Sequence, residues 1–207
     1  MAQRKAPRRG LVLGGGGILG AAWMVGALKA LEEIQGFDPR SVDYIVGTSA
    51  GSVLTALLGA GVSVDQLVDH QHGNAIAEGP LAGYSWDYEK ATGRNRPQLP
   101  RLLGPGSGKL IRRTLSGGAR KMPPTAVLSA FMPAGKGSLD RVGHLVDAFT
   151  PYGEWSPHPN AWIVALDYES GRRVAFGHEN APRVPLSEAV MASCAIPGWF
   201  RPMQIQN

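Results

Sequence analysis

A serine stands between two glycines in the segment Gly47-Thr48-Ser49-Ala50-Gly51. The pattern G-x-S-x-G is typical of a tight turn between a strand and a helix, where the glycines let a substrate reach the hydroxyl. The apolar runs that such a turn requires are present on both sides, at 44–46 and 52–54. We therefore predict that Ser49 is the nucleophile of a serine acyl hydrolase and that Gly47 and Gly51 shape its turn. An ordinary glycine-rich turn is the alternative.

A second glycine-rich segment, residues 14–20, lies about thirty residues before this serine. Acyl transfer places negative charge on a carbonyl oxygen, and one preorganised N–H donor stabilises that charge by about 3–4 kcal/mol. Gly15, Gly17 and Gly20 also match G-x-G-x-x-G, a pattern of phosphate-binding turns in nucleotide-binding folds. Those folds end the next strand in an acid, whereas Asp38 and Asp43 precede that strand here. An oxyanion hole is therefore favoured over a nucleotide site.

Alternating strand and helix patterns surround both motifs. The sequence predicts strands at 10–13, 42–46, 161–167 and 172–176, the last two forming a hairpin, and helices at 18–34, 50–58, 64–71, 138–149 and 186–195. Two strand–turn–helix units in the first sixty residues are typical of a parallel α/β sheet. On the first helix we expect Trp23, Ala27, Leu28 and Leu31 to share one face. The last residues are expected to begin another strand.

The 207 residues suit one domain, which we place at 10–207 behind a basic tail at 1–9. Within it, residues 73–137 are rich in Gly and Pro and are predicted to form an irregular insertion or lid. Ten basic residues and no acid lie between Lys90 and Leu139. Such a segment suggests an anionic partner, and we expect peripheral contact with an anionic membrane through residues 90–136 rather than with nucleic acid. A solvated loop is the alternative.

Several classes of protein are disfavoured. The single cysteine, Cys194, allows no internal disulfide. The apolar stretch at 11–31 contains six glycines and one lysine, which makes it a poor signal peptide or membrane-spanning helix. We therefore expect a cytoplasmic protein, peripheral to a membrane at most, with no metal ion and no cofactor.

The two motifs together resemble the patatin-like phospholipase family. The segments that carry the resemblance are residues 11–17 with 26–33, residues 45–52, and residues 189–198, where a helix runs into an Ile-Pro turn. The resemblance implies a three-layer α/β/α fold and a Ser-Asp dyad that cleaves acyl esters of lipids or phospholipids. It also implies that Gly15, Gly16 and Gly17 line the oxyanion hole, in a loop motif that ends at Gly20.

The sequence departs from the family pattern in two places. Leu19 stands where the family usually has Arg or Lys, so oxyanion stabilisation is expected to come from N–H groups alone. The chain has no Asp-Gly pair, in which the dyad aspartate would lie. We therefore expect an N-terminal portion of a longer precursor, incomplete at its C-terminal end and inactive alone. Asp167 and His178 are not expected to act as the base. A non-catalytic nucleotide- or membrane-binding module is the alternative function.

Overall fold

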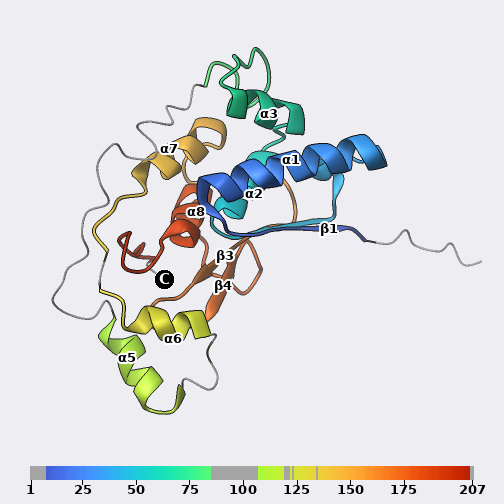
Figure 1. Ribbon diagram of the computed structural model, residues 1–207. Helices are drawn as coiled ribbons and strands as arrows, with labels where there is room; N and C mark the ends of the chain where they lie inside the picture. The colour runs from blue at the N-terminus through green and yellow to red at the C-terminus, as the bar shows by residue number, and fades with distance from the viewer. Residues whose placement is uncertain (1–7, 85–106, 119–121, 123, 134, 206–207) are drawn as a thin grey trace, which may run out of the picture.

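The computed structural model describes residues 8–84, 107–118, 122, 124–133 and 135–205. In the labels of Figure 1, its elements are β1 (Gly10–Leu13), α1 (Gly17–Gln35), the 3₁₀ turn η1 (Pro39–Ser41), β2 (Tyr44–Gly47), α2 (Ala50–Gly59), α3 (Val64–His72), α5 (Gly108–Leu115), α6 (Pro124–Ala130), α7 (Asp140–Phe149), β3 (Ala161–Leu166), β4 (Arg173–Phe176) and α8 (Leu186–Cys194). Apart from the expected C-terminal strand, the predicted elements are present, with ends shifted by at most two residues.

The strands form one sheet in the order β1-β2-β3-β4. β1, β2 and β3 run parallel, with Leu13 beside Gly47 and Gly47 beside Ile163, and β4 pairs antiparallel with β3 as the predicted hairpin. Because parallel strands end at one edge, the turns after β1, β2 and β3 all lie at the same edge of the sheet. This edge holds both glycine-rich motifs.

Helices lie on both sides of the sheet, which gives the expected three-layer α/β/α arrangement. In Figure 1, α1, α2, α3, α7 and α8 lie above the strands, and α5 and α6 lie below them beside the β3–β4 hairpin. Of the upper helices, α2 and α8 pack directly on the strands, while α1 packs on α2 and α3, and α7 packs on α8.

The central helix α2 is buried along almost its whole length. One side, with Leu54, Leu57 and Leu58, belongs to a core shared with α1 and α3. The opposite side places Ala56 in a second core with β3, β4, α7 and α8. Burial of a leucine side chain stabilises a fold by about 1.5–3 kcal/mol, so α2 and the residue at its start are held firmly.

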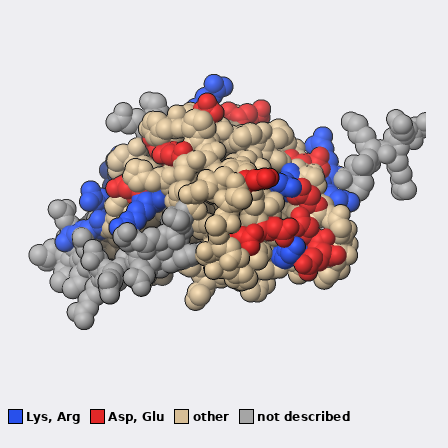
Figure 2. Space-filling model, turned by 90° about the horizontal axis from the view of Figure 1, so that it is seen from above, with Lys and Arg blue, Asp and Glu red and all other residues tan. Residues whose placement is uncertain are grey.

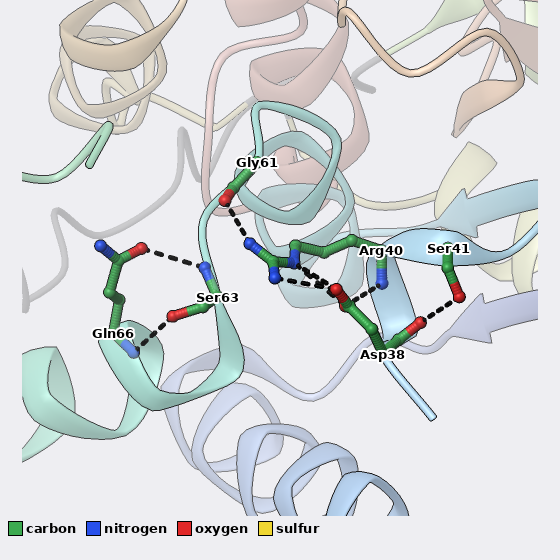
Figure 3. Close-up of polar contacts among 6 residues, drawn as sticks. All are labelled: Asp38, Arg40, Ser41, Gly61, Ser63 and Gln66. Carbon is green, nitrogen blue, oxygen red and sulfur yellow. Dashed lines mark hydrogen bonds and ion pairs between the residues drawn. The ribbon is translucent and has the colours of Figure 1, made fainter. Parts of the chain in front are cut away.

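The corner that joins β2, α2 and α3 is fixed by polar contacts (Figure 3). Ser63 and Gln66 form a reciprocal capping box at the start of α3, with N–O distances of 3.0 and 3.2 Å. Arg40 holds the Asp38 carboxylate with two N–H groups and donates a third bond to the carbonyl of Gly61, 2.9 Å away. The turn before β2 is thereby tied to the end of α2.

Two sequence predictions about surfaces and ends are wrong. Of the four residues expected on one face of α1, Trp23 is 75% exposed and only Leu28 is buried, together with Met24 and Val25. Residues 201–205 form no strand, and Phe200 makes only an isolated bridge to Gly137.

Candidate active site

Ser49 occupies a strained position at the start of α2. Its φ is 52° and its ψ is −122°, and it is the only non-glycine residue with positive φ in the described part of the chain. Such a conformation costs of the order of 1–3 kcal/mol, so neighbouring structure must hold it. Although Ser49 is the N-cap residue, its hydroxyl makes no capping bond. The turn thus leaves the hydroxyl free of a capping role.

The glycines on either side of Ser49 allow the chain to pack closely here. A Cβ on Gly51 would collide with the carbonyl oxygen of Leu13 and lie 2.7 Å from that of Gly14. A Cβ on Gly47 would collide with the carbonyl oxygen of Gly51 and the hydroxyl of Thr55. The first turn of α2 can therefore reach the end of β1, where the Gly51 N–H donates to the Gly14 carbonyl over 3.0 Å.

The glycine loop after β1 lies against the serine. A Cβ on Gly15 would be 3.5 Å from the Ser49 Cβ, so Gly15 leaves the space beside the nucleophile open. The N–H groups of Gly15, Gly16 and Gly17 donate to no acceptor among the residues that the structure describes. The predicted loop is thus next to the predicted nucleophile. Leu19, which replaces the usual basic residue, is 85% exposed.

Two neighbours of Ser49 come from the end of α8, and the sequence analysis assigned neither of them to the site. The Ser49 N–H donates to Ser193 Oγ over 2.8 Å, and Ser193 Oγ donates to the Val164 carbonyl over 2.6 Å. The next residue, Cys194, has its thiol 3.8 Å from Ser52 Oγ. The block at 189–198 was noted for its family resemblance, but no local pattern marked these two positions.

Cys194 is a neutral neighbour of the serine and not a base. Burial raises the pKa of its thiol, and hydrogen bonding to the hydroxyls of Ser52 and Ser49 offsets this only in part. A thiol with a raised pKa stays protonated at neutral pH. Cys194 packs against the second core, and its sulfur faces the Ser52 hydroxyl at the start of α2.

The two titratable residues considered as bases, Asp167 and His178, make their contacts away from Ser49. Partial burial pushes the pKa of Asp167 upward. The Ser170 hydroxyl, the N–H groups of Glu169 and Ser170, and the charge of Arg113 outweigh this and leave the pKa lowered. His178 stacks edge-on against Trp162, with ring centroids 5.2 Å apart. Within the described ranges, no carboxylate or imidazole is hydrogen-bonded to Ser49.

No group of three or more His, Cys, Asp or Glu side chains is placed to hold a metal ion in the described ranges. None of the helices in this part of the chain combines the length and the apolar character needed to cross a membrane.

Comparisons with known proteins cover nearly the whole chain. The family model described as patatin-like phospholipase matches residues 11–207. Among solved structures, the type III effector ExoU is 21% identical, with a TM-score of 0.46 over 93% of this chain and 40% of that one. The ExoU–SpcU complex from the type III secretion system of Pseudomonas aeruginosa is 22% identical, with a TM-score of 0.39 over 93% of this chain and 37% of that one. The chain therefore spans about two fifths of the length of these structures.

The comparison with curated proteins found no match. The family match begins at the second residue of β1 and spans the rest of the sheet and both glycine-rich motifs. This chain belongs to the patatin-like phospholipase family.

Proposed function

We propose that the protein is a lipid acyl hydrolase that uses Ser49 as its nucleophile. The observation that carries the proposal is the strained backbone of Ser49, whose hydroxyl makes no capping bond and lies beside Gly15. Strain at a nucleophile is retained when it exposes the reacting atom, as in other strand–turn–helix elbows. Family membership supports lipid esters as the substrate class.

In the proposed reaction Ser49 Oγ attacks the carbonyl carbon of a fatty acyl ester. The alcohol of the lipid leaves with a proton, and the acyl group remains bonded to Ser49. Water then hydrolyses this acyl-enzyme, which releases the fatty acid and restores the hydroxyl. The base that takes the serine proton is, by the family resemblance, an aspartate outside the described residues.

The proposed oxyanion hole consists of the N–H groups of Gly15, Gly16 and Gly17. These groups have no acceptor among the described residues, and they stand at the start of α1, where the helix dipole favours negative charge. Ala50 offers a further donor that the sequence analysis did not consider. Its N–H, the first of α2, also lacks an acceptor in the described ranges.

A fluorophosphonate probe tests the nucleophile directly, because it reacts with activated serines and forms a stable bond to Oγ. In a form of the protein that contains the dyad aspartate, we expect mass spectrometry to find the label on Ser49 and to find none in Ser49→Ala. Ser116→Ala, which removes an exposed hydroxyl whose one partner among the described residues is the Arg113 carbonyl, should be labelled like the wild type. Since the Ser49 hydroxyl has no capping role, Ser49→Ala should keep the thermal unfolding midpoint.

Labelling of another serine, or equal labelling of Ser49→Ala, would contradict the assignment of the nucleophile. Hydrolysis of a p-nitrophenyl ester addresses the base. Ser49-dependent turnover at an ordinary enzymatic rate of about 1–1000 s⁻¹ would place that base within the 207 residues. Stabilisation by nucleotides without any labelling would instead favour the nucleotide-binding module.

A further inference from the structure

The pairing of β2 with β3 stops just before the nucleophile. Gly47 is the last residue of β2 and lies beside Ile163, so the next carbonyl of β3, that of Val164, has no strand partner on this side. Two hydroxyls take its place. Ser193 Oγ donates to the Val164 oxygen over 2.6 Å, and Thr48 Oγ1 donates to the same oxygen over 3.1 Å.

The bond to Val164 fixes the direction of the next bond. A hydroxyl has one hydrogen, and that of Ser193 is given to the carbonyl, so a lone pair of Oγ is left to accept. The Ser49 N–H donates to it over 2.8 Å. Ser193 therefore joins three parts of the fold that are distant in sequence: the end of α8, β3 and the nucleophile turn.

The other bonds of the turn hold its flanks. Thr48 N–H donates to the Leu13 carbonyl over 3.1 Å, and Gly51 N–H donates to the Gly14 carbonyl over 3.0 Å. The Ser49 carbonyl accepts from the Ser52 hydroxyl and N–H, both within its own helix turn. Among the described residues, the only backbone hydrogen bond that ties Ser49 itself to another element is the one that its N–H donates to Ser193.

We propose that Ser193 is a positioning residue: it holds the Ser49 backbone in its left-handed conformation and so aims the hydroxyl at the substrate. This inference rests on the proposed function, because it assigns Ser193 a role in the reactivity of Ser49. Because the Ser49 N–H donates to Ser193, it is not available to the oxyanion hole, and the donors proposed there are those of the glycine loop and Ala50.

Three variants separate positioning from general stability. Ser193→Ala removes the clamp, and Ser193→Thr keeps a hydroxyl at the same place. Ser187→Ala is the matched control. It also removes a serine hydroxyl from α8, but the Ser187 hydroxyl is buried without a hydrogen-bond partner in the described part of the chain. Thermal unfolding midpoints of all three report any loss of stability.

The first measurement is hydrogen exchange of the Ser49 amide by NMR, which does not depend on catalysis. Loss of one hydrogen bond should speed exchange about three- to tenfold in Ser193→Ala, with wild-type rates in Ser193→Thr and Ser187→Ala. Equal exchange in Ser193→Ala and the wild type would overturn the clamp.

The second measurement is the second-order rate of fluorophosphonate labelling. Misaligned nucleophiles lose rate steeply, so we expect Ser193→Ala to label about ten- to a hundredfold more slowly, with recovery in Ser193→Thr and no change in Ser187→Ala. A labelled wild type with equally fast Ser193→Ala would overturn the positioning role alone. A wild type that stays unlabelled even when a segment with the dyad aspartate is supplied would overturn the proposed function and the positioning role with it, while amide exchange still decides on the bond.

Discussion

Gly51 lies where the first turn of α2 touches the end of β1. Its missing side chain is required, because a Cβ there would collide with the Leu13 carbonyl. We expect Gly51→Ala to push α2 away from β1 and to lower the free energy of unfolding by about 1–3 kcal/mol. Since the elbow moves with α2, labelling of Ser49 should slow as well. Urea unfolding and probe labelling measure the two effects.

Gly26 provides the matched control for this substitution. It lies within α1, and a Cβ there would meet nothing within 4 Å. Alanine is a better helix former than glycine, so Gly26→Ala should raise the free energy of unfolding by about 0.5–1 kcal/mol and leave labelling unchanged. If both variants behaved alike, the close contact between α2 and β1 would not be the reason for glycine at position 51.

The same residues show what sequence reasoning can find at a site. Ser49 and Gly15 carry local patterns, because a nucleophile turn and an oxyanion loop each need particular residues at fixed spacing. Ser193 carries none, since its bond to Ser49 joins residues 144 positions apart. A serine near the end of an apolar helix has many ordinary explanations. Only the fold brings its hydroxyl to the elbow.

At the level of elements, the contact between Asp38 and Arg40 ties η1 to the end of α2 (Figure 3). Hydrogen bonds from the Arg40 side chain lower the pKa of the Asp38 carboxyl below its ordinary value of 3.8. A lowered folded-state pKa stabilises the protein above the unfolded-state value and loses this effect as the pH falls. The wild type should therefore exceed Asp38→Asn in stability at pH 7 and lose this advantage below about pH 4.

Urea unfolding of both proteins at pH 7 and pH 3 checks the prediction. The pair is partly exposed, with side chains 36% and 39% accessible, so screening by solvent keeps the difference small. Addition of salt should reduce it further at pH 7. A difference that stayed constant between the two pH values would mean that Asp38 acts through shape and not through charge.

The order of elements could be predicted, but the orientation of α1 could not. Strands and helices followed from apolar runs broken by glycines, and these breaks depend on the local chain. α1 carries large apolar residues on several sides, including Trp23, Leu28 and Ile34. Packing against α2 and α3 decides which face of α1 is buried. When a helix is apolar on several sides, its periodicity does not indicate that face.

Across the whole molecule, charge is distributed unevenly. On the face in Figure 2, most acidic side chains lie toward the centre and right, where some basic ones lie among them, and a further group of basic side chains lies at the left. In Figure 1, α5 lies at that same end of the molecule. Its Lys109 pairs with Glu169 at 2.7 Å, while Arg112 and Arg113 are exposed. This helix belongs to the segment for which the sequence predicts contact with an anionic membrane.

If α5 meets the membrane, its two arginines should account for part of the affinity. Each basic residue near an anionic surface is worth about 1 kcal/mol, so Arg112→Gln with Arg113→Gln should weaken binding to phosphatidylglycerol vesicles on the order of 30-fold. Arg141→Gln with Arg183→Gln removes the same charge from exposed positions elsewhere and should have little effect. Co-sedimentation with vesicles at low and high salt measures both. Equal losses in the two double variants would show that net charge, and not a surface on α5, drives the binding.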